Sequence, residues 1–167
     1  MDDDKLAAPN RHKHFDVDSG GRLLYEWEQT LDEVNVFVPT DATAHATRDL
    51  NVLVTGKTIE IIATKTEVVV FPKLELFRPT IADESVWTRD ASTGEIHVQV
   101  VKQKKAEPWV GAFAAHCGDE ATAKRISEEE RRRMMASRFQ REHPGFDFSE
   151  AEFEDGKIPD ASEWNVK

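Results

Sequence analysis

Hydrophobic and polar residues alternate along much of the chain between residues 21 and 105. The apolar residues of this pattern recur at every second position in five stretches: Tyr25 and Trp27; Val34, Val36 and Val38; Leu50, Val52 and Val54; Ile59, Ile61 and Ala63; Ile96, Val98 and Val100. A period of two places alternate side chains on one face of an extended strand, so these stretches predict half-buried β-strands. Residues 68–71 form a continuous apolar run instead, which predicts a strand covered on both faces.

Short polar connections separate these strands. Gly56 and Lys57 form a two-residue loop with glycine first, which predicts a type II′ hairpin. Residues 64–66 and 91–94 predict further tight turns. Because no long helix separates the strands, they must pair antiparallel, and we predict an all-β fold, an antiparallel β-sandwich.

The regions on either side of the sandwich differ from it in composition. Residues 1–20 are polar and predict a flexible N-terminal arm. Residues 106–167 form a C-terminal extension in which Asp119 to His143 predicts a polar helix that Pro144-Gly145 ends. Residues 127–130 read Ser-Glu-Glu-Glu, which is typical of a capping box. The apolar stripe (Ile126, Met134 or Met135, and Phe139) is thin, so we expect the helix to rest lightly on the sandwich or to project from it.

Composition narrows the classes of function. Among 167 residues there are 32 acids and 22 bases, a net charge of −10, which disfavours binding to nucleic acid or to an anionic membrane. The single cysteine, Cys117, has no partner for a disulfide within the chain. No apolar run is long enough for a membrane span, so we expect an intracellular, water-soluble protein.

Several motifs suggest chemistry, but each has a simpler explanation. Gly56-Lys57-Thr58 lacks the earlier glycine of a phosphate-binding loop and leads into a strand rather than a helix. His12 and His14, or His116 beside Cys117, do not make a recognisable set of metal ligands. Adjacent residues such as His116 and Cys117 rarely orient as base and nucleophile. We therefore expect a binding protein with no cofactor and no metal rather than an enzyme.

Three stretches together resemble the NudC-like CS-domain family. They are residues 25–34, YEWEQTLDEV; residues 74–88, LELFRPTIADESVWT; and residues 138–152, RFQREHPGFDFSEAE. The resemblance covers residues 22 to 165, and the order and spacing of the three stretches make it specific. It implies a sandwich of seven to eight strands, akin to the α-crystallin fold, with a C-terminal helical extension.

The resemblance also implies a function. Proteins of this family are non-enzymatic co-chaperones that act with heat shock protein 90 and support the dynein and nuclear-migration pathway. The implied clients are β-propeller proteins such as the lissencephaly-type dynein regulator. The implied location is cytoplasmic, in association with the cytoskeleton or the centrosome, and the implied oligomeric state is a monomer or a weak homodimer.

Certain residues follow from this resemblance as structural signatures. We expect Trp27 and Trp87 to be buried between the sheets rather than exposed as binding residues, because large aromatic side chains stabilise a core. After Pro144-Gly145, the side chains of Phe146 and Phe148 share one face of an extended chain. We expect that face to dock on the sandwich.

Two functions remain open. In the first, the protein is an adaptor whose basic residues meet an acidic patch on the chaperone; the candidates are Lys57, Lys65, Lys73, Arg78 and Lys102. Each could equally be a solvated residue that protects a strand edge from aggregation. In the second, the protein is a stand-alone holdase that covers apolar surface on clients. Ile158-Pro159-Asp160 is a poor match to the assembly segment of small heat-shock proteins, which favours the adaptor.

Overall fold

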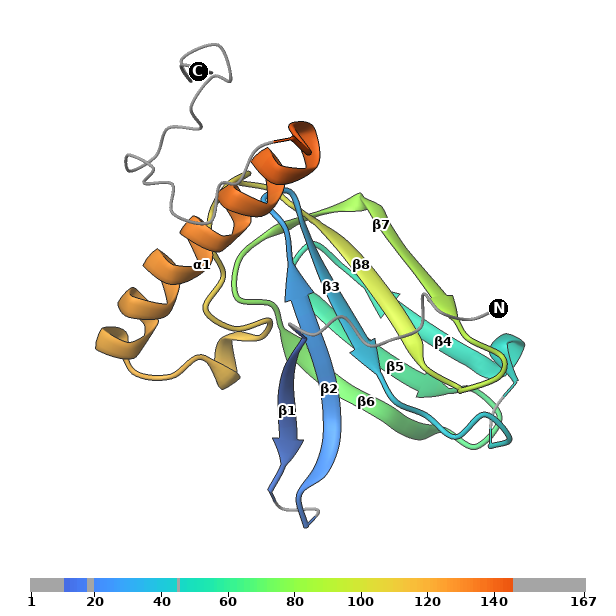
Figure 1. The fold of residues 1–167 in the computed structure, drawn as a ribbon. Helices are drawn as coiled ribbons and strands as arrows, with labels where there is room; N and C mark the ends of the chain where they lie inside the picture. The colour runs from blue at the N-terminus through green and yellow to red at the C-terminus, as the bar shows by residue number, and fades with distance from the viewer. Residues whose placement is uncertain (1–10, 18–19, 45, 146–167) are drawn as a thin grey trace, which may run out of the picture.

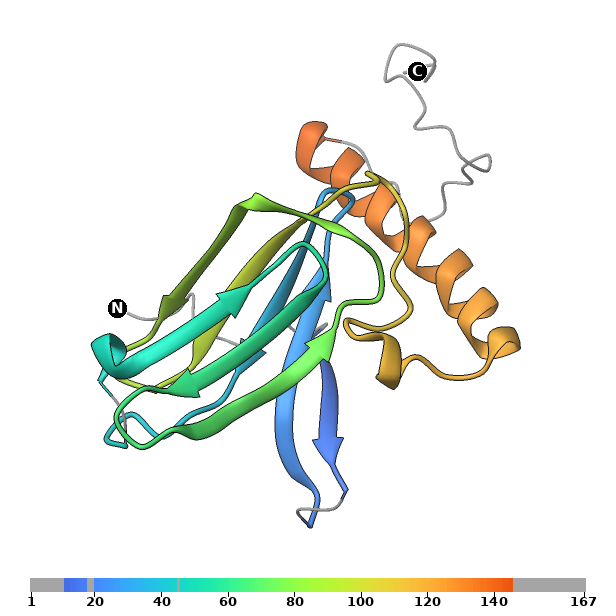
Figure 2. The same ribbon diagram turned by 180° about the vertical axis from the view of Figure 1, so that it is seen from behind.

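Two antiparallel β-sheets face each other in the structure, a computed structural model that describes residues 11–17, 20–44 and 46–145 (Figures 1 and 2). The larger sheet has the strand order β1-β2-β3-β8-β7 and the smaller β4-β5-β6. The elements of the described residues are β1 (His12–Asp16), β2 (Arg22–Gln29), β3 (Glu33–Val38), η2 (Thr47–Asp49), β4 (Leu50–Val54), β5 (Thr58–Ala63), β6 (Val68–Glu75), β7 (Thr80–Arg89), β8 (Ile96–Lys102), η3 (Ala114–His116) and α1 (Glu120–Glu142). The predicted antiparallel sandwich with a C-terminal helix is confirmed.

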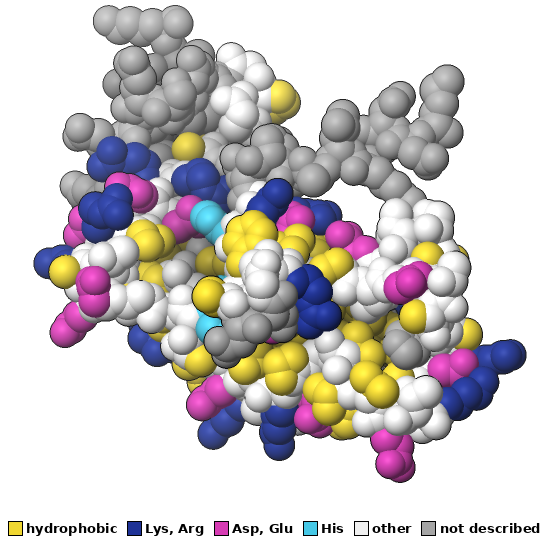
Figure 3. Space-filling view, turned by 90° about the horizontal axis from the view of Figure 1, so that it is seen from below, with side chains coloured by type: hydrophobic (Ala, Val, Ile, Leu, Met, Phe, Trp, Pro, Cys, Tyr) yellow, Lys and Arg dark blue, Asp and Glu magenta, His cyan; other side chains and the backbone are white. Residues whose placement is uncertain are grey.

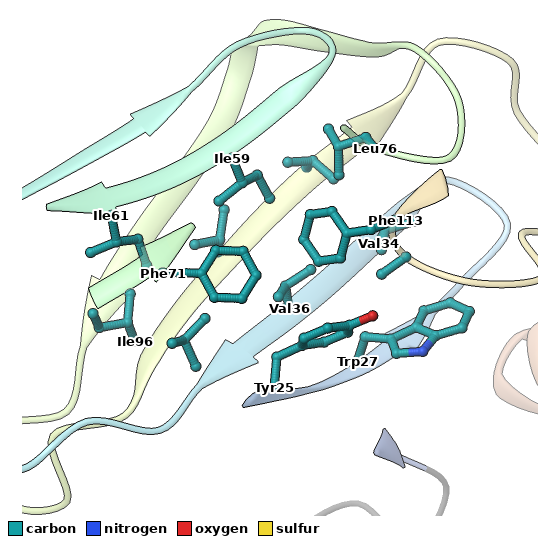
Figure 4. Close-up of a cluster of buried hydrophobic side chains, with 14 of the residues drawn as sticks. Tyr25, Trp27, Val34, Val36, Ile59, Ile61, Phe71, Leu76, Ile96 and Phe113 are labelled. Carbon is teal, nitrogen blue, oxygen red and sulfur yellow. The ribbon is translucent and has the colours of Figure 1, made fainter. Parts of the chain in front are cut away.

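The core lies between the sheets, where the inward positions of the alternating strands meet (Figure 4). Val34 and Val36 of β3 face Ile59 and Ile61 of β5 across this space, and all four are fully buried. Burying one such side chain contributes about 1.5–3 kcal/mol, so the period of two in the sequence accounts for most of the driving force.

Residues beyond the last strand complete this core. Trp109, Ala112 and Phe113 are buried in the same cluster as the strand residues. Phe113 forms a β-bridge with Leu76, and its ring lies edge-on to that of Tyr25 at 5.0 Å. The C-terminal extension, predicted to begin at residue 106, therefore contributes side chains to the core of the sandwich.

The flexible arm predicted for residues 1–20 is wrong for part of this range, because the range includes a β-strand. Residues 12–16 form β1, which pairs with β2 so that His12 lies opposite Trp27 and His14 opposite Tyr25. Backbone pairing gives this short polar segment partners that its composition does not reveal. Residues 1–10 lie outside the described part of the chain.

The strand at residues 68–71 is not covered on both faces as predicted. It begins β6, an edge strand, and Val68 and Val69 are 52% and 56% exposed. Pro72 lies in the same strand. Proline has no N–H to donate to a neighbour, so it is tolerated at the edge of a sheet and not in its centre.

The connection between β4 and β5 is the predicted two-residue loop, closed by a bond from Thr55 N to Thr58 O of 2.9 Å. Gly56 is not among the residues with positive φ, so the turn is not type II′. A Cβ at Gly56 would stand 2.9 Å from the carbonyl oxygen of Thr80. The glycine therefore permits a close approach of β7, whose Thr80 N–H donates to Gly56 O at 2.8 Å.

Helix α1 occupies the predicted position. Asp119 is the N-cap and accepts a hydrogen bond from Thr122 N at 2.8 Å, and His143 is the C-cap. The capping box at residues 127–130 is wrong, because these residues lie inside the helix. No helix in the described part of the chain is long and apolar enough to cross a membrane.

The helix crosses one end of the sandwich beside the β2–β3 turn (Figure 1). Met134 and Met135 are buried with Leu31 of that turn, and Phe139 is buried one turn further on. The predicted apolar stripe is confirmed at these positions, and it attaches the C-terminal half of α1 to the sandwich.

A buried polar network fastens the middle of the helix. The carboxamide of Gln29, on β2, donates to Trp109 O at 2.7 Å and to Glu130 Oε2 of α1 at 3.0 Å. Its oxygen accepts from Trp109 N at 2.8 Å and from Lys102 Nζ of β8 at 3.0 Å. Two donors and two acceptor positions are thus all used, which is the full capacity of a glutamine side chain.

Glu130 carries the charge of this network on α1. Burial alone would raise the pKa of its carboxyl group, but hydrogen bonds from His12, Arg133 and Gln29 and the charge of Arg133 outweigh burial and lower the pKa to about 2. Arg133 contacts both carboxylate oxygens, at 3.2 and 2.8 Å. The buried carboxylate is therefore ionised and paired, as buried charges must be.

Replacing Gln29 with leucine should destabilise the fold strongly. The Gln29→Leu change leaves the buried N–H and C=O of Trp109 without a hydrogen-bond partner and removes one acceptor from Lys102. We therefore expect a loss of about 3–5 kcal/mol in the free energy of unfolding. Urea denaturation measures the loss. The matched control is Gln99→Leu, on the half-buried outer side of β8, which should change stability by less than about 1 kcal/mol. Equal losses for the two variants would contradict the role of the network.

Candidate partner-binding surface

The outer face of the three-stranded sheet carries a row of apolar side chains that no described element covers. Ile62 of β5 lies opposite Val69 of β6 and diagonally across from Leu53 of β4. Leu53 is 42% exposed and Val69 56%, while Ile62 is half-buried between them. We call these three residues the apolar strip. Figure 3 shows hydrophobic side chains gathered over the β6 side of the molecule, with charged side chains around them.

Three of the five predicted partner-binding residues surround the apolar strip. Lys57 lies in the β4–β5 turn, Lys65 in the β5–β6 turn at the other end of the sheet, and Lys73 on β6; all three are exposed. Lys65 pairs with Asp49 at 3.1 Å. An apolar centre with a charged rim is the usual anatomy of a protein–protein interface.

Arg78 lies elsewhere, beyond the end of β6. Its guanidinium stacks on the ring of Phe77 at 4.1 Å and pairs with Glu107 at 3.4 Å. These residues line an open groove of about 1180 Å³ between the 107–118 segment and the first turns of α1. Arg78 therefore does not share a surface with the three lysines.

The prediction that Lys102 binds a partner is wrong. Lys102 is fully buried, and its ammonium group donates to Thr30 O at 2.7 Å and Glu107 O at 2.8 Å as well as to Gln29. Burial lowers the pKa of Lys102 to about 8 despite the nearby carboxylates of Glu107, Asp32 and Glu130. A lysine with three protein acceptors and no exposed surface holds the fold together rather than meeting another molecule.

The signature residues occupy different environments. Trp27 is buried in the core as expected, whereas Trp87 of β7 is only half-buried and packs against the edge of the same cluster. Pro144 and Gly145 follow α1 and are exposed. Phe146 and Phe148 lie outside the described residues, so their docking stays a prediction.

The structure brings together histidines that the sequence keeps apart. The rings of His14 on β1 and His116 in η3 stack with centroids 3.7 Å apart, and His116 Nδ1 is hydrogen-bonded to the Tyr25 hydroxyl at 2.8 Å. His12 lies 4.8 Å from the ring of Trp27 and 3.7 Å from Glu130 Oε1. These side chains line a cavity of about 380 Å³ between β1 and α1. They tie β1 to the rest of the molecule.

Burial disfavours the charged forms of His116, Tyr25 and Cys117 in the folded state. Burial, together with the nearby His14, lowers the pKa of His116, and burial raises the pKa of the Tyr25 hydroxyl. Burial likewise raises the pKa of Cys117, whose thiol donates to Phe113 O at 3.3 Å. The thiol is therefore held in its less reactive, protonated form.

Within residues 11–17, 20–44 and 46–145, no three His, Cys, Asp or Glu side chains are placed to hold a metal ion. The stacked rings of His14 and His116 face each other rather than a common point. What the described residues offer is an exposed sheet face with an apolar centre. This arrangement suits recognition of another protein.

Sequence reasoning missed two features that the alternation already contained. Lys102 continues the inward series of β8 after Ile96, Val98 and Val100, so its register placed it inside. Leu53 and Ile62 occupy the outward positions of β4 and β5, where apolar residues are unexpected. No local signal could have placed His14 beside His116 or Gln29 beside Glu130.

Comparison with known proteins agrees with this architecture. The family model of the CS domain matches residues 23–102. NudC domain-containing protein 2 of Homo sapiens and that of Mus musculus are each 30% identical to the chain over 128 residues, which are 76% of this chain and 77% of the relative. The solution structure of the CS domain of the human KIAA1068 protein has a TM-score of 0.51 at 15% identity, over 70% of this chain and 86% of that one.

Acidification should weaken the fold through His116. The unfolded chain binds the imidazole proton near pH 6.5, whereas the folded chain binds it only at lower pH, so stability falls as the pH decreases through about 6.5. The variant His116→Phe keeps an aromatic ring and cannot titrate, so it should lose less stability between about pH 7.5 and 5.5 than the original chain.

Urea unfolding at both pH values measures this difference, and an NMR titration of the His116 ring measures the pKa directly. His97, whose pKa burial also lowers, contributes equally to both proteins and drops out of the comparison. A ring that titrates at or above its ordinary pKa, or the same pH dependence in the two proteins, would show that the cluster tolerates charge.

Proposed function

Because the chain belongs to the NudC-like branch of the CS-domain family, we propose that it is a co-chaperone that binds a heat shock protein 90-type chaperone and stabilises client proteins of the dynein and nuclear-migration pathway. Family membership supports a co-chaperone-like role in general, since CS-domain proteins of the NudC family are generally co-chaperones rather than enzymes. The chaperone, the pathway and the clients are the proposed part.

The observation that carries the proposal is the apolar strip with its lysine rim. Leu53, Ile62 and Val69 form a row across three strands, in which Leu53 and Val69 are exposed and Ile62 is half-buried. An adaptor needs such a surface, because apolar contact supplies affinity and peripheral charge supplies orientation and rate. Lys57, Lys65 and Lys73 suit an acidic patch on the chaperone, and this charged part of the interface should weaken with salt.

The clients in this proposal are β-propeller proteins such as the lissencephaly-type dynein regulator, held on a second surface while the strip engages the chaperone. The groove beside Arg78 is separate from the strip and is open along one side of α1. Such a division lets one small domain contact two proteins at once. The corresponding location is the cytoplasm, with an association with the cytoskeleton or the centrosome.

A second candidate function is a stand-alone holdase. It is favoured by the number of large hydrophobic side chains exposed among the described residues: Phe15, Val17, Leu53, Val68, Val69 and Val86. Exposed apolar surface can shield an unfolding client without a partner chaperone. Light scattering of an aggregating client with the purified protein alone separates the two functions, because only a holdase suppresses the aggregation.

The variants Val69→Asp and Val86→Asp form a matched pair, since both valines are 56% exposed but lie on opposite sheets. If the strip binds the chaperone, Val69→Asp should weaken binding by at least about tenfold and Val86→Asp should leave it nearly unchanged. Calorimetric or NMR titration at low salt, with and without nucleotide, measures the affinity. Unfolding midpoints verify that both variants fold.

A titration of the original chain that shows no binding at low salt in either nucleotide state would remove the adaptor function. Equal weakening by both substitutions would place the contact elsewhere. A triple variant in which Lys57, Lys65 and Lys73 are all changed to glutamine should bind with a weaker dependence on salt. Its affinity at high salt should change little, because the charges are already screened there.

A further inference from the structure

A third hollow lies where the C-terminal half of α1 meets the β2–β3 turn. It has a volume of about 330 Å³ and is lined by residues 28–31 and by one face of the helix, namely Arg133, Met134, Ser137, Arg138 and Arg141. We call it the arginine groove. Positions 134, 137, 138 and 141 follow the three- and four-residue spacing of a single helix face. The groove is therefore a continuous feature of the fold.

The floor of the arginine groove is apolar. Leu31 and Met134 are each 3% exposed and belong to one hydrophobic cluster. A methionine sulfur makes favourable contacts with aromatic rings. A floor of this kind suits the insertion of an aromatic side chain.

The walls of the groove are cationic. Three arginines and a single carboxylate, Glu28, are among its lining residues. Arg133 pairs with Glu130, whereas Arg138 pairs with Glu142 at 3.2 Å and with Asp32 at 3.9 Å. The Arg138 pairs are exposed by a third or more, so they are worth less than about 1 kcal/mol and exchange easily. Arg141 is exposed and makes no ion pair with another described residue.

The chain itself carries a segment of complementary chemistry. The described residues end at Gly145, one turn beyond Arg141, and 22 residues follow. These begin Phe146-Asp147-Phe148-Ser149-Glu150 and contain seven acids and two bases, a net charge of −5. Three residues of extended chain span about 10 Å, so the start of this segment can reach a groove built from the last turns of α1.

We propose that the arginine groove binds the chain's own residues 146–150. The two phenylalanines contact Leu31 and Met134 on the floor, and Asp147 and Glu150 face Arg138 and Arg141 on the walls. Two phenylalanines separated by one residue share a face of an extended chain, which is the spacing this needs. Neither the chaperone nor a client takes part, so this inference is independent of the proposed function.

Arginine stacks on phenylalanine at two other places among the described residues. The guanidinium of Arg11 lies 3.4 Å from the centroid of the Phe37 ring, and that of Arg78 lies 4.1 Å from the Phe77 ring. Stacking of arginine on an aromatic ring contributes about 0.5–2 kcal/mol, more when water is excluded. A groove with arginines on its walls and an apolar floor therefore favours a segment that has both a phenylalanine and flanking carboxylates over a segment that has only one of the two.

Methionine NMR on the full chain tests the proposal. The chain has three methionines; Met134 lines the groove, and Met135 is buried in the same hydrophobic cluster. In a Cys117→Ser background, a nitroxide attached at Ser149→Cys should broaden the Met134 methyl signal strongly. The double change Phe146→Ser/Phe148→Ser should restore most of that intensity, whereas the control Phe153→Ser should leave the broadening in place. Unfolding midpoints identify any variant that fails to fold.

Charge reversal provides a second readout. Arg141→Glu should also relieve the broadening, and adding Glu150→Arg should bring it back, because the pair is then reversed rather than lost. Raising the ionic strength from about 0.05 to 0.5 M should reduce the broadening as the charges are screened. The proposal would be overturned if the broadening of the Met134 signal were unchanged in the Phe146→Ser/Phe148→Ser variant. It would also be overturned if adding Glu150→Arg to Arg141→Glu did not bring the broadening back.

A mixed sample identifies the source of the segment. Spin-labelled chains without isotope are mixed with isotope-labelled chains that carry no nitroxide. If the groove binds the segment of its own chain, the Met134 signal in this sample should stay sharp. Broadening in the mixed sample would mean that a second copy supplies the segment, and the inference of an internal contact would be wrong.

Discussion

The side chain of Gln29 connects four parts of the molecule. It belongs to β2 and contacts the end of β8 through Lys102, the 103–109 segment through Trp109, and α1 through Glu130. A buried polar network stabilises a fold only when each of its groups has a partner, because an unpaired group in the interior loses its water without replacement. The helix, the last strand and the loop that closes the core are therefore fixed together.

This network explains how so polar a helix can belong to the sandwich. The only hydrophobic residues of α1 that are buried are Met134, Met135 and Phe139. Polar attachment comes from the buried carboxylate of Glu130, which Gln29 and Arg133 satisfy, and from the exposed ion pair between Arg138 and Asp32. Buried ion pairs add little net stability by comparison with apolar packing, but they fix geometry, because only one arrangement satisfies every donor and acceptor.

The sequence predicted those elements whose side chains alternate or whose ends carry capping residues. The strands around Val34, Ile59 and Val98 and the helix from Asp119 to His143 follow from local pattern alone, because period and capping are properties of neighbouring residues. The open face of β6 was predicted wrongly, since an apolar run does not reveal whether a second layer lies above it. Strand β1 was missed because its partners come from β2 and η3 rather than from its own sequence.

The candidate binding surface was predictable in part, for the same reason. Lys57, Lys65 and Lys73 were found as isolated basic residues, and the sequence could show their type but not that the sheet arranges them around Leu53, Ile62 and Val69. Lys102 was misplaced because its charge was given more weight than its position in the alternation of β8. The register of a strand decides burial before residue type does, provided that the interior supplies three acceptors for the ammonium group.

Pro72 affects how readily the exposed apolar edge of β6 can pair with a further strand. A flat, unguarded edge rich in valine is a template on which further strands can stack into cross-β fibrils. On β6, a residue with no amide hydrogen and an adjacent lysine interrupt the edge immediately after its valines. Backbone pairing with a further strand is disfavoured there while the sheet face stays accessible, so an exposed apolar surface coexists with a sheet edge that is a poor template for fibril growth.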